Sequence, residues 1–258
     1  MKKGNGMRNI VDYTENYNVP NFEDYQIIYR RKKVLEIVHK YAPKRILEIG
    51  CGMEPLFQYI DGNYKSYHIV EPSSVFYDNA VRLAEGKNVN CIHDFFPTEK
   101  GLQDVQFDFI LCSGLLHELE QPEELLKGIL KVSNENTLVH INVPNAKSLH
   151  RLVAKGMGLI ADEYALSDRN LLYQQHNVFD LESLIGFMEY VGFEVVEYGS
   201  YFAKPFSHGQ MYRMVKEKVI TEKALDGLYG IVQYIPEYGS EIFVNCRLRS
   251  IKNKGQAE

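Results

Sequence analysis

Short apolar runs alternate with amphipathic stretches along most of the chain, and this pattern predicts strands joined by helices. The apolar runs cover residues 45–49, 67–71, 89–92, 107–112 and 137–143. Helical patterns lie between them at 55–60, 74–85 and 122–132. Continuous apolar strands that alternate with helices are typical of a parallel sheet covered on both faces. The sequence therefore predicts an α/β fold with a doubly wound, mostly parallel sheet.

The pattern changes towards both ends of the chain. Residues 22–41 predict a helix, because acidic residues open it, basic residues follow and apolar residues form a stripe. Residues 146–178 predict a helix and loops, and we interpret them as an insertion that caps the sheet. Beyond them the pattern predicts a helix at 181–191, a strand at 193–199, a helical stretch at 210–229 and a strand at 241–248.

These elements predict one domain over residues 21–250. Residues 1–20 are polar and rich in glycine and asparagine, which favours a flexible arm or a lid. The last residues, 251–258, predict a disordered tail. We expect a monomer or a homodimer.

Composition excludes several functional classes. The formal net charge of −5 argues against nucleic-acid binding, which depends on clustered Lys and Arg. The longest apolar stretches are about half of what a membrane span requires, so we expect no membrane association. The four cysteines lack paired metal or redox spacing, which predicts reduced thiols and a cytoplasmic protein. No set of His, Asp and Glu has the spacing of metal ligands, so we predict no metal.

The strongest local signal is a glycine turn directly after the first predicted strand. Gly50 and Gly52 allow the backbone to approach a ligand closely. Glu71 ends the next strand, about 20 residues further on, where an acid can accept hydrogen bonds from ribose hydroxyls. This combination predicts a ligand that contains adenosine.

Two adenosine ligands compete for this turn. A dinucleotide fingerprint requires a third glycine where this chain has Pro55, and a pyrophosphate would be repelled by Glu48 and Glu54. S-adenosylmethionine instead carries an ammonium and a sulfonium, which a carboxylate at the strand end attracts. The residues favour S-adenosylmethionine. A nicotinamide-dependent oxidoreductase and a non-catalytic module that binds S-adenosylmethionine are the alternatives.

Residues 45–145 resemble the class I S-adenosylmethionine-dependent methyltransferases. The first motif of that family matches at Glu48, Gly50 and Gly52, whereas Glu54 replaces its third glycine. The resemblance implies a seven-stranded sheet of order 3-2-1-4-5-7-6 with an antiparallel last strand, and S-adenosylhomocysteine as the product. The C-terminal half is weakly similar to methyltransferases of bacterial surface-polysaccharide and nucleotide-sugar pathways.

The resemblance also implies roles for residues at the other strand ends. Glu71 would bind the ribose, Asp94 would accept the adenine amino group, and Phe95 would lie against the adenine ring. The segment 107–119 resembles the fourth strand and the loop that closes over the cofactor, which implies a contact from Ser113.

Two histidines are candidates for the chemistry. His117 follows the fourth strand, where the reactive methyl group should lie, and His176 belongs to the predicted capping insertion. Either could accept a proton from a hydroxyl or ammonium group.

The acceptor itself is predicted from the residues around it. His150, Tyr173 and Lys204 are candidates for binding it, whereas His208 predicts an exposed turn. We expect methyl transfer to an oxygen, or as a second choice a nitrogen, of a small polar acceptor that can be anionic. A sugar derivative and a capsule phosphoramidate precursor are examples.

Overall fold

The computed structural model describes residue 10, residues 21–98 and residues 100–249. Of the predicted arm or lid over residues 1–20, only Ile10 is among them. The predicted tail over residues 251–258 lies outside the described residues, as do the side chains of Asp168 and Arg169.

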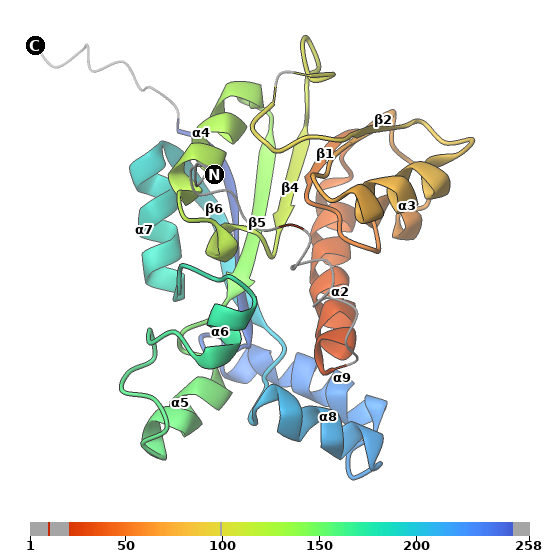
Figure 1. Cartoon of the computed structure of the whole chain (residues 1–258). Helices are drawn as coiled ribbons and strands as arrows, with labels where there is room; N and C mark the ends of the chain where they lie inside the picture. The colour runs from red at the N-terminus through yellow and green to blue at the C-terminus, as the bar shows by residue number, and fades with distance from the viewer. Residues whose placement is uncertain (1–9, 11–20, 99, 250–258) are drawn as a thin grey trace, which may run out of the picture.

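A seven-stranded sheet forms the centre of the molecule (Figure 1). Its spatial order is β3-β2-β1-β4-β5-β7-β6, and β7 runs antiparallel to both of its neighbours. This order and the doubly wound α/β class are as predicted. The strands are β1 (Arg45–Ile49), β2 (Ser66–Val70), β3 (Val89–Ile92), β4 (Phe109–Ser113), β5 (Leu138–Pro144), β6 (Phe193–Tyr201) and β7 (Glu241–Leu248).

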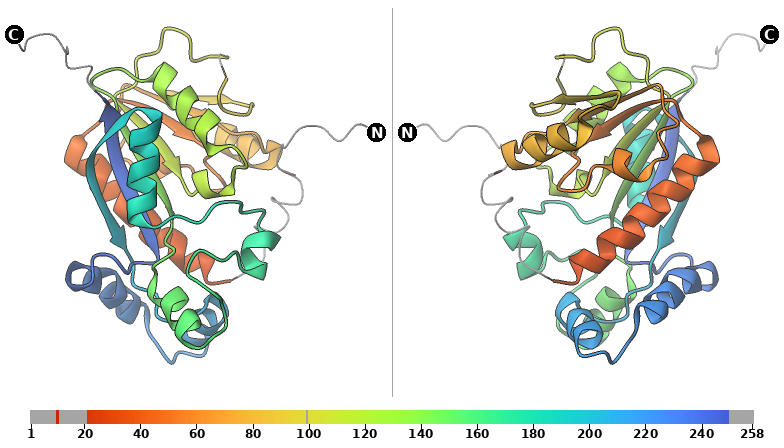
Figure 2. Two further views of the ribbon diagram at one scale, coloured as in Figure 1. Left: turned by 90° about the vertical axis from the view of Figure 1, so that its left-hand side faces the viewer. Right: turned by 90° about the vertical axis from the view of Figure 1, so that its right-hand side faces the viewer.

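Helices cover both faces of this sheet (Figure 2). One face packs against α4 (Pro122–Val132) and α7 (Leu181–Val191) through a buried cluster that includes Ile129 and Met188. The opposite face packs against α2 (Glu23–Tyr41) and α3 (Ser74–Ala84). Because apolar side chains cover both faces, the central strands can be mostly apolar on both faces, as their sequences are.

Further helices gather beyond the carboxyl ends of the parallel strands (Figures 1 and 2). They come from two separate segments of the chain. The segment predicted as an insertion contributes α5 (Leu149–Gly156) and α6 (Asp168–Leu172), and the chain between β6 and β7 contributes α8 (His208–Lys216), α9 (Glu222–Gly230) and the 3-10 helix η3 (Ile231–Tyr234).

Two predicted helices differ from the structure. The stretch 210–229 is divided into α8 and α9, because Lys218 adopts a φ of +59° and Thr221 caps the second helix by accepting from Ala224 N. The predicted helix 55–60 is the 3-10 helix η1 (Leu56–Tyr59). Pro55 is extended, with ψ at 137°, so an extended residue separates the glycine turn from the helix.

A polar cluster lies inside the sheet between β5 and β7. His140 Nδ1 lies 2.7 Å from Asn245 Oδ1, and His140 Nε2 lies 3.1 Å from Asn142 Nδ2. The amide therefore donates to Nε2, and Nδ1–H donates to Asn245. Burial lowers the pKa of His140 to about 4, because the interior disfavours an imidazolium.

We predict that His140 makes the fold acid-sensitive. The pKa of His140 in the folded protein lies below its ordinary value of about 6.5, so only the unfolded chain takes up this proton as the pH falls from about 6.5 to 4. Stability should fall by about 3 kcal/mol over that window. His140→Gln should lose this part of the pH dependence in denaturant titrations, and the exposed control His39→Gln should keep it. Equal slopes for His140→Gln and the wild type would contradict the assignment.

Candidate functional site

A cavity of about 900 Å³ lies at the carboxyl edge of the sheet, between the strand ends and the capping segments. Most of the predicted site residues line it, and Ile10 does too. From the prediction these are Glu48, Gly50, Gly52, Glu71, Phe95, Ser113, His117, His150, Tyr173 and Lys204. Asp94 and His176 are not among the lining residues. Segments far apart in the sequence thus form one site.

The glycine turn between β1 and η1 is held by Glu71. Gly50 and Gly52 have φ values of +74° and +58°, which only glycine adopts without strain. The N–H groups of Cys51 and Gly52 donate to Glu71 Oε2 at 3.0 and 3.3 Å, and Ser73 N donates to Oε1 at 2.9 Å. Burial raises the pKa of Glu71, while these donors oppose the shift. The carboxylate is therefore fixed in place before any ligand binds.

Glu48 is buried beside the turn. Its carboxylate accepts from Tyr67 Oη at 2.8 Å and from Leu56 N at 3.2 Å, which anchors the start of η1 to β1. Burial raises its pKa to about 7, and the neighbouring Glu71 contributes to the shift. Two buried carboxyl groups make this end of the cavity favourable for a cation.

Glu54, which occupies the third glycine position of the motif, turns towards α2. It forms an ion pair with Arg31, and the Arg31 guanidinium lies 3.8 Å from the centre of the Tyr59 ring. The charge of Glu54 is therefore paired. Repulsion of a pyrophosphate, which we predicted from Glu48 and Glu54, would come from Glu48 and Glu71 instead.

Asp94 and Phe95, although adjacent in the sequence, have different surroundings. The Asp94 carboxylate accepts from Phe95 N at 2.9 Å and Thr98 Oγ1 at 2.8 Å, and it lies 3.0 Å from Lys100 Nζ. Lys100 lowers the pKa of Asp94. These contacts stabilise the loop after β3, and Asp94 itself is not among the residues that line the cavity, so its role as the adenine contact stays a prediction. The Phe95 side chain does line the cavity.

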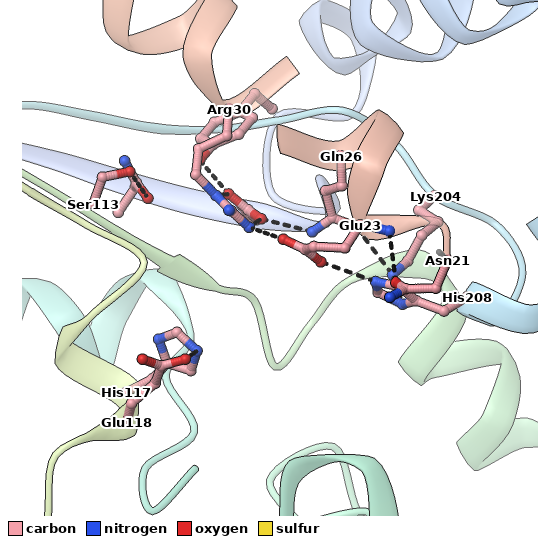
Figure 3. A network of polar contacts seen from close by, with 12 residues as sticks. Asn21, Glu23, Gln26, Arg30, Ser113, His117, Glu118, Lys204 and His208 are labelled. Atoms are coloured by element: carbon pink, nitrogen blue, oxygen red, sulfur yellow. Dashed lines mark hydrogen bonds and ion pairs between the residues drawn. The ribbon is translucent and has the colours of Figure 1, made fainter. Parts of the chain in front are cut away.

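The two candidate histidines also lie in different surroundings. The 3-10 helix η2 (Leu116–Glu118) buries His117 in the cavity wall, with Nε2 3.8 Å from Glu118 Oε1 (Figure 3). His176 is exposed. Its backbone N–H and that of Asn177 both donate to His117 O at 3.0 Å. Of the two histidines, His117 is therefore the one that lines the cavity, and the prediction missed its neighbour Glu118.

A buried polar network forms the wall provided by α2 (Figure 3). Arg30 bridges two carboxylates, with Nη2 2.8 Å from Glu23 Oε1 and Nε 2.9 Å from Glu241 Oε2. Gln26 Nε2 donates to Glu241 Oε1 at 2.6 Å, and the Tyr201 hydroxyl donates to the same carboxylate. The prediction missed this network, although residues 23, 26 and 30 repeat at the helical spacing that puts side chains on one face.

Lys204 joins this network from the chain after β6. Only 1% of the residue is exposed, and its Nζ lies 2.7 Å from His208 Nδ1 and 3.3 Å from Gln26 Oε1. Because an ammonium only donates, His208 Nδ1 accepts and Nε2–H donates to Glu23 Oε2 at 3.3 Å. His208, predicted as an exposed turn residue, is instead half-buried at the start of α8 and lines the cavity.

Within the described part of the chain, no group of three or more His, Cys, Asp or Glu side chains is arranged to hold a metal ion. No helix in the same residues is long and apolar enough to cross a membrane.

Comparisons with known proteins point to one family. A family model described as a methyltransferase domain matches residues 25–198. The polyketide synthase component of lovastatin nonaketide synthase from Aspergillus terreus is 25% identical over 181 residues, which are 66% of this chain. The chain spans only 3 to 6% of the length of the curated relatives it matches.

Solved structures share the fold. The N-methyltransferase NodS of Bradyrhizobium japonicum, in complex with S-adenosylhomocysteine, is 14% identical with a TM-score of 0.52, covering 91% of each chain. The 1,6-didemethyltoxoflavin-N1-methyltransferase of Burkholderia thailandensis is 12% identical with a TM-score of 0.59, covering 93% of this chain and 85% of that one. At these identities the likeness shows the fold alone.

We predict that the Arg30 network supports stability as well as the cavity wall. Arg30→Met leaves Glu241, only 1% exposed, without its cation and should cost about 3–5 kcal/mol in chemical unfolding. Arg30→Met combined with Glu241→Gln should recover much of this loss. The exposed control Lys32→Met should change stability by less than about 1 kcal/mol. A cost for Arg30→Met as small as that of the control would contradict the role of the network.

Proposed function

Because the chain belongs to the methyltransferase-domain family, we propose that it transfers the methyl group of S-adenosylmethionine to an oxygen of a small polar acceptor. One observation carries this proposal: groups suited to binding the cofactor and groups suited to binding the acceptor line the same cavity. The glycine turn and Glu71 line it together with His117 and the polar residues around Lys204. Methyl transfer is an in-line displacement, so bringing cofactor and acceptor into one enclosed space supplies most of the catalysis.

The cofactor would occupy the carboxyl ends of β1 and β2. Glu71 would accept hydrogen bonds from the ribose hydroxyls, while Gly50 and Gly52 allow close approach of the backbone. The buried Glu48 favours the positive charge of the cofactor. The same arrangement disfavours the alternative of a dinucleotide, whose pyrophosphate would lie beside two buried carboxyl groups.

His117 is the proposed general base. A hydroxyl acceptor must lose its proton as the methyl group is transferred, and a positioned imidazole can take it. Glu118 Oε1, 3.8 Å from His117 Nε2, would stabilise the imidazolium that forms. An amine acceptor would use the same base, so nitrogen is the second choice.

The acceptor would face the wall formed by α2 and the segments after β5 and β6. Charged and amide side chains there, such as Gln26 and Lys204, favour a polar molecule, and Tyr173 and His150 are further proposed contacts. Sugar derivatives and phosphoramidate precursors are therefore the first acceptors to screen. A polyketide-like acceptor is a second candidate, because the curated relatives are named as polyketide synthases.

Binding and turnover test this proposal in two steps. Calorimetry should detect S-adenosylhomocysteine binding without NAD binding, and a screen with S-adenosylmethionine should then identify an acceptor. Binding of NAD instead would select the oxidoreductase alternative. Tight S-adenosylhomocysteine binding with no turnover on any acceptor class would select a non-catalytic binding module.

We predict that Glu71 controls cofactor affinity and Asp94 does not. Glu71→Ala removes two charge-assisted hydrogen bonds to the ribose, each worth about 1.5–3 kcal/mol, so affinity should fall at least about tenfold. Asp94→Ala is the matched control, because Asp94 is not among the lining residues and its carboxylate accepts from groups of its own loop. Calorimetry with S-adenosylhomocysteine measures both variants. A larger loss in Asp94→Ala than in Glu71→Ala would restore Asp94 to the cofactor site.

We predict that His117→Ala lowers turnover about 10²–10⁴-fold, as the loss of a general base should. Its affinity for S-adenosylhomocysteine should stay within a few-fold of the wild type. His176→Ala is the matched control, because its exposed side chain should leave turnover nearly unchanged. Steady-state kinetics on an acceptor from the screen measures both. Full turnover in His117→Ala would mean that the acceptor needs no base from the protein.

A further inference from the structure

Three segments meet on the side of the cavity formed by the ends of β5 and β6. His150 N, at the start of α5, donates to Lys204 O at 3.0 Å, and Ser240 N, before β7, donates to Phe202 O at 2.8 Å. His150, Lys204 and Ser240 all line the cavity. Backbone hydrogen bonds therefore fix these side chains next to the space that we assign to the acceptor.

The position of Ser240 depends on the glycine before it. A Cβ atom on Gly239 would lie 2.6 Å from both Ser200 Oγ and the backbone of Tyr201. Only glycine therefore lets this segment lie so close to the end of β6. The contact leaves Ser240 2% exposed, with Gly239 N donating to Ser200 Oγ at 3.0 Å.

Two buried polar atoms in this wall have no hydrogen-bond partner among the described residues. They are Ser240 Oγ and His150 Nδ1. An unsatisfied buried polar group is costly, and folded proteins rarely leave one without a partner. The backbone N–H of His150 does have a partner, Lys204 O, so among these groups it is the side-chain atoms that lack one. The two unsatisfied side chains therefore point to a ligand.

The charges around these atoms indicate the kind of ligand. Burial holds the pKa of His150 well below its usual range, and Lys204, His208 and Arg151 lower it further, so the imidazole is neutral near pH 7. The carboxylates of Glu23 and Glu241 both pair with Arg30. A neutral Nδ1–H and a serine hydroxyl are donors in a positively charged surrounding, which suits an oxygen that carries negative charge.

We propose that Ser240 and His150 bind an anionic oxygen group, a carboxylate or a phosphate, of the methyl acceptor. The inference rests on the proposed function only in assigning this group to the acceptor. Lys204 contributes positive charge to the subsite. The anionic group would orient the acceptor from this wall, and the atom to be methylated would lie nearer to His117.

The test uses the full chain saturated with S-adenosylhomocysteine and measures thermal unfolding with added anions. Inorganic phosphate or acetate at millimolar concentration should raise the Tm, whereas glucose at the same concentration should not. The anion with the larger effect distinguishes a phosphate subsite from a carboxylate subsite. Ser240→Ala and His150→Gln should each reduce the apparent affinity for that anion at least about tenfold.

Ser240→Ala should also change the Tm of the anion-free protein, in the opposite direction from a substitution of a hydrogen-bonded serine. Removing an unsatisfied buried hydroxyl should raise the Tm of the anion-free protein by about 2–4 °C. The control is Ser133→Ala, because Ser133 Oγ donates to Ile129 O at 2.7 Å. That variant should lose stability and keep the anion effect.

The outcomes separate this inference from the proposed function. The anionic subsite would be overturned if no anion changes the Tm, or if Ser240→Ala and His150→Gln both retain the anion effect. Neither result would affect the binding of S-adenosylhomocysteine. A lower Tm for anion-free Ser240→Ala would also count against it, since that hydroxyl would then be satisfied. Failure of the wild type to bind S-adenosylhomocysteine would overturn the proposed function instead. If Ser240→Ala does not fold, His150→Gln carries the test alone.

Discussion

The ion pairs of Arg30 with Glu23 and Glu241 hold the functional edge of the molecule together. Glu241 is the first residue of β7, aligned with Pro144 of β5 and Tyr201 of β6. Because β7 is antiparallel, its beginning lies where the neighbouring strands end. A parallel last strand would place this carboxylate at the opposite edge of the sheet. The reversed strand thus provides the carboxylate to which α2 is bound, and α2 becomes a wall of the cavity.

The two ends of the cavity differ in charge. Buried carboxyl groups, Glu48 and Glu71, line the end at the glycine turn, and burial raises the pKa of both. Around His150 the charged neighbours are the cations Lys204 and Arg151. These charges favour the arrangement proposed above, with the cationic methyl donor at the glycine turn and the acceptor beside Lys204.

The sequence predicted the features that depend on local pattern. Apolar runs located the strands, and Gly50, Gly52 and Glu71 located the turn and the acid that holds it. The strand order followed from the family resemblance, since no local pattern encodes which strands pair. Motif position does not reveal that the Asp94 carboxylate has partners within its own loop, at Thr98 and Lys100.

The rest of the site depends on contacts between distant segments. His208 is half-buried because Glu23, Lys204 and the ring of Phe22, all distant in the sequence or from another element, lie against it. His176 is exposed, and its backbone N–H donates to His117 O, a contact between segments far apart in the sequence. In the sequence of α2, polar residues repeat at the spacing that places them on one helix face, but such a face is usually exposed to solvent. It becomes a cavity wall here because the start of β7 lies against it.

A crystal structure of the chain with S-adenosylhomocysteine would show whether one cavity holds the donor and the acceptor groups together. We expect ribose hydroxyls within about 2.5–3.2 Å of the Glu71 carboxylate and a sulfur atom that faces the space between His117 and Lys204. A ligand bound away from Glu71, or a sulfur atom separated from His117 by protein, would show that the cavity does not bring the two reactants together.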